Sequence, residues 1–297
     1  MDDRKLEVFL AVVQTGSFSK ASQISNCTQS AVTQMMNSFE AELGCKVLDR
    51  SHAGVKLTDA GEDLLPTIIE ASNALSRLSR RASEQAHAVS EGTPAPLRIG
   101  SFASIADTWL PEALLEFRKQ HKNLAFDIRI GSDILSNWLL RGEVDVALGD
   151  AERLRGFRWY ALMDDVYCAV LEDKDYKEGL EYVTIEDLVK RPLILAPFDV
   201  WGRRMDALLP HADIVHCDDN QTLLTMVSKG FGTTIMPRMC LSGLPENTHV
   251  VALRPRTVRT VGVGVPNTPR KEANDLVDFL LPYCKENAEE IAERTYK

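Results

Sequence analysis

The stretch GSFSKASQISNCTQSAVTQMMNSFEAELGCKVLDRSHAGVKLTDAG, residues 16–61, decides the fold of the N-terminal part of the chain. Its middle carries apolar residues at helical spacing, namely Val32, Met36, Phe39 and Leu43. Intervals of four, three and four residues place them on one face, which predicts an amphipathic helix. Thr28 is suited to cap the start of this helix, and Gly44 to end it in the left-handed conformation.

Two shorter helices are expected before it. Apolar residues at helical spacing over residues 3–15 are Leu6, Phe9, Leu10 and Val13, and Gly16 ends that segment. Lys20 to Ser25 forms a second helix, which contributes Ala21 and Ile24 to the same core. The three helices therefore enclose one small core.

The other face of the third helix carries neutral side chains that can both donate and accept hydrogen bonds. They are Gln29, Ser30, Thr33, Gln34 and Asn37. Side chains of this kind can contact base edges in the major groove of DNA, and Gln and Asn match adenine well. On periodicity alone, a solvated polar face is the simpler interpretation.

The surrounding residues favour the first interpretation. Residues 16–21 (GSFSKA), 28–34 (TQSAVTQ), 40–44 (EAELG), Arg50 and 55–61 (VKLTDAG) follow one another as in the N-terminal signature of LysR-type transcription regulators, which the chain resembles. The resemblance implies a winged helix-turn-helix over residues 1–58, with a basic residue on each wing strand. The DNA-binding residues that we expect are Ser17, Thr28, Gln29, Ser30, Thr33, Gln34, Asn37, Arg50 and Lys56.

The chain departs from the family pattern at three positions. Members of the family commonly carry a basic residue where Gln34, Asn37 and Ala53 stand here. Each missing cation removes one neutralised phosphate, which lowers the dependence of binding on salt. We therefore expect one module alone to bind non-specific DNA weakly.

A long linking helix is predicted over residues 59–90. Intervals of four and three separate the residues of one stripe, which are apolar except for one glutamine: Leu64, Ile68, Ala71, Leu75, Leu78, Ala82, Gln85 and Val89. This heptad pattern favours pairing with a second copy, although packing on the helix's own domain is the alternative. The resemblance implies a homodimer or a homotetramer, which presents two or more recognition helices to DNA.

The C-terminal part reads as an α/β domain. Ser90–Pro96 (SEGTPAP) marks a boundary, after which short strands alternate with helices, predicting a parallel sheet flanked by helices. Expected strands include 97–100, 126–130, 144–149, 166–171 and 258–265. This part, residues 91–297, resembles the LysR effector domain, which is similar to two-lobed periplasmic binding proteins.

That resemblance implies two lobes with a small-molecule effector between them. The expected lobes are residues 95–163 plus 266–297, and residues 164–265. Loops at the carboxyl ends of the strands should line the cleft, and serines near helix starts favour a carboxylate or another anion. Asp133, Asp150 and Asp199 in the same loops would repel a purely anionic ligand. An effector with both a donor and an acid is therefore a second option. The expected effector-binding residues are Ser101, Phe102, Ser104, Ser132, Asp133, Asp150, Phe198, Trp201 and Thr222.

Composition and motifs exclude several other classes. The net charge of −9 argues against a protein that coats nucleic acid, and no apolar run or signal-like N-terminus is present, so we expect a cytoplasmic protein. The six cysteines form no CxxC pair and the six histidines show no ligand spacing, so no metal or cofactor is expected. No catalytic motif is found, and the cluster His216-Cys217-Asp218 would point its side chains to opposite faces of a strand, so an enzyme is not expected. A transport-type binding protein would not explain the N-terminal module.

Overall fold

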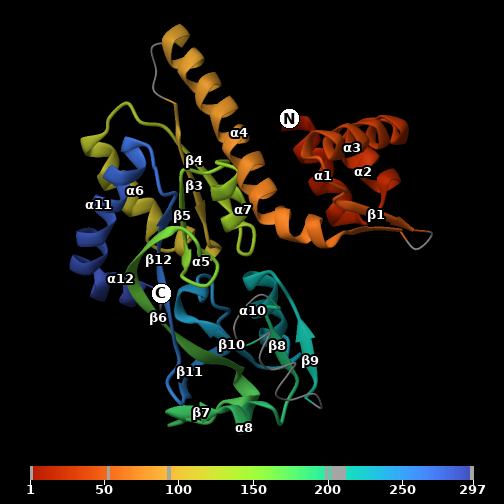
Figure 1. Cartoon of the computed structure of the whole chain (residues 1–297). Coiled ribbons are helices and arrows are strands. Elements are labelled where there is room, and N and C mark those ends of the chain that lie inside the picture. The colour runs from red at the N-terminus through yellow and green to blue at the C-terminus, as the bar shows by residue number, and fades with distance from the viewer. Residues whose placement is uncertain (1–2, 52–53, 92–94, 198–200, 202–211, 295–297) are drawn as a thin grey trace. The chain divides into compact units, whose positions relative to one another are not determined.

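The computed structural model describes residues 3–51, 54–91, 95–197, 201 and 212–294 (Figure 1). The chain folds into two compact units. The N-terminal unit comprises Met1–Ala95 and the short segment Leu140–Glu143, and the C-terminal unit comprises Pro96–Leu139 and Val144–Lys297. Each unit has its own hydrophobic core.

The N-terminal unit contains three helices and a two-stranded sheet. They are α1 (Asp3–Thr15), α2 (Phe18–Ile24), α3 (Gln29–Leu43), β1 (Leu48–Ser51) and β2 (Gly54–Leu57). Thr28 caps α3 by accepting from the Ala31 amide at 3.2 Å, and Gly44 ends it at φ 74°, as the sequence predicts. The expected start of α2 was wrong, because Ser17 caps the helix and α2 begins two residues earlier than Lys20.

The core of this unit explains the spacing of its apolar residues. The rings of Phe9 on α1 and Phe39 on α3 lie 5.2 Å apart, and both side chains are fully buried. Helix α4 (Asp59–Glu91) also packs here, with Ile68 only 5% exposed and Leu64 against the same cluster. The first half of the predicted heptad pattern therefore packs on its own unit, whereas Leu78 is 64% exposed.

The C-terminal unit is built on a mixed sheet with the strand order β4-β3-β5-β12-β6-β11-β7, and β10 pairs with β6. The strands are β3 (Leu97–Ser101), β4 (Phe126–Ile130), β5 (Val146–Asp150), β6 (Arg158–Glu172), β7 (Tyr182–Thr184), β10 (Thr234–Pro237), β11 (Thr248–Arg254) and β12 (Val258–Val265). Strands β4, β3 and β5 are parallel, but β12 runs antiparallel to both β5 and β6. Parallel pairing is thus confirmed for these three strands and also for β7 with β11, whereas the sheet as a whole is mixed.

Helices and a second, small sheet complete this unit. The helices are α5 (Ala103–Ala106), α6 (Leu110–Gln120), α7 (Leu135–Leu140), α8 (Ile185–Leu188), α10 (Asn220–Ser228), α11 (Lys271–Glu286) and α12 (Ala288–Arg294), with 3-10 turns η1 (Asp173–Asp175) and η2 (Arg238–Cys240). The small sheet pairs β8 (Leu193–Leu195) with β9 (Ile214–His216) in parallel.

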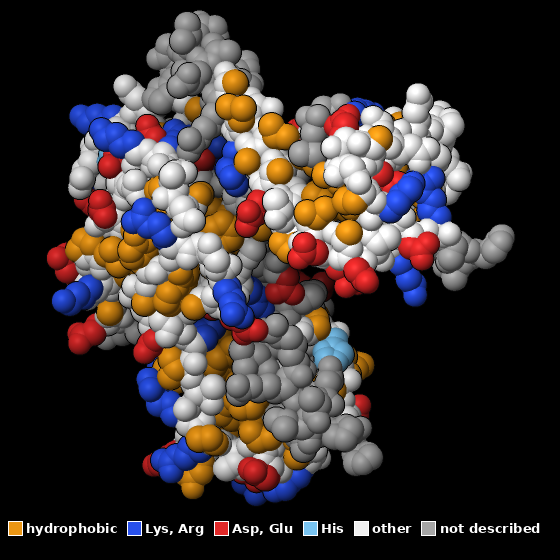
Figure 2. Space-filling view, in the orientation of Figure 1, with side chains coloured by type: hydrophobic (Ala, Val, Ile, Leu, Met, Phe, Trp, Pro, Cys, Tyr) orange, Lys and Arg blue, Asp and Glu red, His pale blue; other side chains and the backbone are white. Residues whose placement is uncertain are grey.

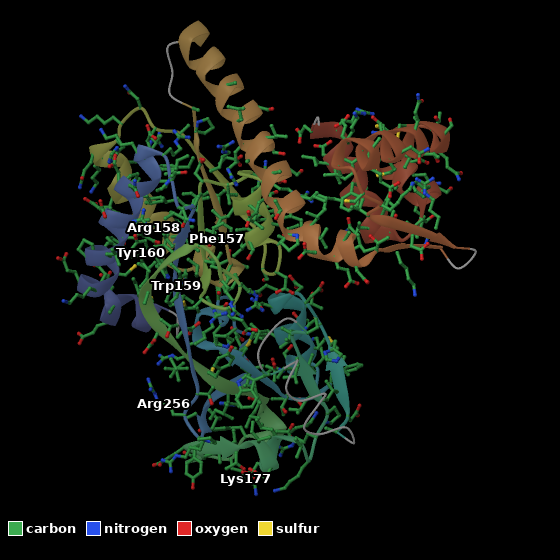
Figure 3. The ribbon with its side chains drawn as sticks, viewed as in Figure 1. Phe157, Arg158, Trp159, Tyr160, Lys177 and Arg256 are labelled. Carbon is green, nitrogen blue, oxygen red and sulfur yellow. The ribbon has the colours of Figure 1, made fainter. Side chains whose placement is uncertain are left out.

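Strand β6 is much longer than the expected strand at Val166–Leu171. It begins at Arg158, and its residues 158–166 pair with β12 while residues 168–172 pair with β11. Its first residues lie beside α11 in the view of Figure 3, and Trp159 Nε1 donates to the Gly149 carbonyl at 3.3 Å. One strand therefore joins two separate core clusters, one built around β3, β5 and β12 and the other around β6, β8 and β11.

Candidate functional site

The polar face of α3 is accessible. Gln29, Ser30, Gln34 and Asn37 are exposed, and Thr33 is partly exposed. The Thr33 hydroxyl donates to the Gln29 carbonyl at 3.0 Å, and Thr28 and Ser30 share a hydrogen bond of 2.9 Å. The structure thus gathers the predicted polar side chains on one surface, where two of their hydroxyls already make local bonds.

Arg50 ties the wing strand β1 to this helix. Its Nη2 donates to Asn37 Oδ1 at 2.7 Å, and its guanidinium lies 4.7 Å from the centre of the Phe18 ring. The side chain is still 36% exposed. Arg50 and Asn37 are therefore joined by a hydrogen bond on the polar face of α3. Two other predicted DNA-binding residues lie apart from this pair: Lys56 is exposed on the second wing strand, and Ser17 caps α2. Ala53 lies outside the described residues.

Glu40 fixes the turn between α3 and the wing from inside the unit. Its carboxylate, 4% exposed, accepts from the amides of Val47 at 3.0 Å and Leu48 at 3.1 Å, and from Lys46 Nζ at 2.9 Å. Burial by itself would raise the pKa of this carboxyl, but the hydrogen bonds from Lys46 and the two amides outweigh burial and leave the pKa lowered. Glu40 is therefore an ionised group that holds β1 on α3.

The C-terminal unit contains a cavity of about 340 Å³ between residues of both core clusters. Its walls include Phe102, Ala103, Ser104, Asp107, Ser132, Asp150, Arg153, Tyr167, Asp218, Asp219, Asn220, Gln221, Met236, Met239, Cys240 and Arg259. This volume lies in the usual range for small-molecule sites, about 300–1,000 Å³.

Only part of the predicted effector-binding set lines this cavity. Phe102, Ser104, Ser132 and Asp150 do so, as does the loop from Asp218 onward. Four members lie elsewhere. The Ser101 hydroxyl donates to the Phe102 carbonyl, and the Asp133 side chain is 53% exposed. Trp201 packs near Tyr167 in a core cluster, and the Thr222 amide donates to Asp219, the residue that caps α10. Phe198 lies outside the described residues.

Two arginines that sequence reasoning did not select also line the cavity. Arg153 binds Asp150, and its Nε donates to Asp133 at 2.9 Å. Its guanidinium lies 5.4 Å from the centre of the Phe102 ring, and that of Arg259 lies 5.7 Å from the same ring. Arg153 carries a weak local signal, three residues after Asp150, but Arg259 carries none.

Arg259 depends on the register of two strands. In the pairing of β12 with β6, Arg259 stands opposite Asp165. The Arg259 Nε donates to Asp165 Oδ2 at 2.9 Å and its Nη2 to Ser104 Oγ at 2.8 Å, while Asp165 also accepts from the Met239 amide at 3.1 Å. Burial raises the pKa of the Asp165 carboxyl, although Arg259 acts against that rise.

Positive and negative side chains are interspersed on the surface of the C-terminal unit, as the blue and red side chains of Figure 2 show.

Within the described ranges, no group of His, Cys, Asp or Glu side chains is placed to hold a metal ion. Of the helices in the part of the chain that the structure describes, none has the length and apolar character needed to cross a membrane.

Comparison with known proteins identifies the class. Residues 4–62 match the model of the bacterial regulatory helix-turn-helix proteins of the lysR family, and residues 90–285 match the LysR substrate binding domain. The chain belongs to the LysR family of transcription regulators, and combines a DNA-binding helix-turn-helix with a domain for small-molecule effectors.

Relatives and solved structures agree with this class. The chain is 30% identical to the uncharacterized HTH-type transcriptional regulator YvbU of Bacillus subtilis, over 95% of this chain and 97% of that one. Its fold is similar to full-length CbnR complexed with target DNA (TM-score 0.51, 20% identity, 96% and 100% coverage). It is also similar to an OxyR C206 mutant of Corynebacterium glutamicum (TM-score 0.56, 21% identity, 99% and 95% coverage).

Proposed function

We propose that this regulator reads operator DNA with the polar face of α3 and with the wing. The base-reading side chains are Gln29, Ser30, Thr33 and Gln34, and the phosphate-binding cations are Arg50 and Lys56, with Ser17, Thr28 and Asn37 positioning them. The observation that carries this proposal is the bond between Arg50 and Asn37, which places a cation beside an exposed row of neutral donors and acceptors. Such a surface offers both phosphate contact and base readout.

We also propose that an effector in the 340 Å³ cavity controls DNA binding. Phe102, Ser104, Ser132 and Asp150 line that cavity. An effector shifts a regulator between two arrangements only if it binds them with unequal affinity. On this proposal the chain acts by binding alone, without catalysis, in the cytoplasm where it meets chromosomal DNA.

The domain limits that go with this function are 1–58 for DNA binding, 59–90 for pairing, and 91–297 for the effector. The proposed assembly is a homodimer or homotetramer, since the exposed Leu78 continues the heptad pattern beyond the part of α4 that packs on its own unit. Sedimentation of the full chain tests this, and a monomer at micromolar concentration would contradict it.

An unbiased selection from random duplexes, followed by substitution, tests the DNA-binding surface. Gln29→Ala should weaken the selected site by roughly 10- to 100-fold, since a good base contact contributes about 1–3 kcal/mol, and should change binding to random DNA little. Gln14→Ala, at an exposed glutamine on α1, is the matched control. An equal loss on selected and random duplexes would show that Gln29 does not read sequence.

A further inference from the structure

We propose that the effector is a small zwitterion, an amino-carboxylate, whose carboxylate binds Arg259 and whose ammonium group lies by Asp107 and Asp218. This inference rests on the proposed function of the cavity and names the chemical class of its ligand. Of the two options that the sequence left open, a simple anion and an effector with both a donor and an acid, it selects the second.

The anionic end is assigned from the groups that meet at Arg259 in the cavity wall. Arg153 is bound by two carboxylates, those of Asp150 and Asp133. Arg259 is bound by the carboxylate of Asp165, and its Nη2 also meets the Ser104 hydroxyl. The Arg259 guanidinium and the Ser104 hydroxyl, joined by a hydrogen bond of 2.8 Å, both line the cavity and together offer donors for a ligand carboxylate.

The position of Arg259 makes it a rigid anchor. Its side chain is only 15% exposed, and its guanidinium is held by Asp165 and lies by the Phe102 ring. A preorganised donor loses little freedom when it binds a ligand. A carboxylate that enters here shares the guanidinium with Asp165 and does not have to order a mobile side chain.

The cationic end follows from the acids in the same wall. Among the described lining residues there are four carboxylates, Asp107, Asp150, Asp218 and Asp219, against two guanidiniums, each of which already binds a carboxylate. Asp219 caps α10 through the Thr222 amide, and this hydrogen bonding keeps its pKa lowered, so the group stays ionised. Asp107 and Asp218 are exposed. A ligand with only a negative charge would meet net repulsion from this wall, whereas an ammonium group offsets it.

The support for a simple anion is weaker than the sequence suggested. The Ser101 hydroxyl turns to the Phe102 carbonyl and does not line the cavity. Helix α5, which follows, has only four residues and no side-chain cap. A cavity of about 340 Å³ also favours a small molecule with a short apolar part, for which Phe102, Met236 and Met239 supply the surface.

The test uses the full chain and matched probes. Tryptophan fluorescence reports on the C-terminal unit, since all four tryptophans lie beyond residue 95. The probes are the standard amino acids and, for each, the carboxylate without the amino group and the amine without the carboxylate. At least one amino acid should raise the melting temperature and bind about 10- to 100-fold more tightly than both of its truncated partners.

Variants locate the two ends. Asp218→Asn should weaken the binding of the amino acid and leave the binding of the plain carboxylate unchanged. Asp213→Asn is the control, because Asp213 is exposed and lies outside the cavity wall. Arg259→Gln leaves the buried Asp165 carboxylate without its guanidinium partner. If that variant does not fold, the double variant Arg259→Gln/Asp165→Asn, which removes both charges of the pair, tests the carboxylate end.

Two results overturn the inference: a plain carboxylate or plain amine that binds as tightly as the amino acids, or a panel in which no amino acid binds. Neither result contradicts the proposed DNA binding if the selection from random duplexes still yields a preferred sequence. Loss of any duplex preference instead refutes the proposed function.

Discussion

Removal of the Glu40 carboxylate should loosen the wing from the recognition helix. In Glu40→Ala the amides of Val47 and Leu48, both in a buried segment, lose their acceptor. An unsatisfied buried donor costs about 1–3 kcal/mol, so two of them place the loss near ~3 kcal/mol. The lost ion pair with Lys46 adds little to this loss of stability, because the Lys46 side chain is 73% exposed and screened by water.

Glu40→Gln separates the hydrogen bonds from the charge. One carboxylate oxygen, Oε1, accepts from both amides, so the glutamine carbonyl can keep both bonds. What this variant loses is the ionic contact of Oε2 with Lys46 at 2.9 Å and with Arg50 at 3.8 Å. The expected loss is about 1 kcal/mol, clearly smaller than that of the alanine variant.

Hydrogen exchange of peptides from residues 29–57, measured on the full chain by mass spectrometry, reads this out. Since each 1.4 kcal/mol is a factor of ten, Glu40→Ala should speed exchange there by roughly 100-fold. Glu42→Ala, on the same helix, is the control, since that carboxylate makes an exposed pair with Lys5. Wild-type protection in Glu40→Ala would refute the assigned role.

The same carboxyl sets a pH dependence with a defined sign. Because the pKa of Glu40 is lowered in the folded chain, the folded state holds fewer protons than the unfolded one, and stability rises with pH. Its contribution is complete above the ordinary glutamate pKa of about 4.3 and is lost as pH falls through the lower folded value. The difference in exchange between wild type and Glu40→Ala should therefore shrink toward pH ~3.

Three further predictions concern single residues. Arg50→Ala should lower the slope of log binding constant against log salt by about one unit, and an unchanged slope would mean that Arg50 contacts no phosphate. Gly61→Ala should destabilise the N-terminal unit by about 1–3 kcal/mol, because its Cβ would press on the Val47 carbonyl oxygen, and unaltered melting by circular dichroism would contradict this. Burial raises the pKa of Cys284 to about 12, so iodoacetamide near pH ~8 should label the partly exposed Cys45 and spare Cys284 until the chain unfolds, and equal labelling rates would disprove the burial.

The sequence was sufficient where the signal is local. The spacing of Val32, Met36 and Phe39, with Thr28 and Gly44 at its ends, defined α3, because helix periodicity and capping act within a few residues. Strands at 126–130 and 258–265 were likewise found with the limits that the structure has. The family signature, spread over residues 16–61, was enough to identify the class.

Tertiary structure decided what depends on residues far apart in the chain. The length of β6 and the antiparallel course of β12 were not predicted, since a strand's partners and direction are set by pairing across the sheet. The cavity wall followed the same rule: Arg259 meets Asp165 across 94 residues and Ser104 across 155. Strand register, a non-local property, chose these side chains, whereas the recognition helix could be found from its own sequence.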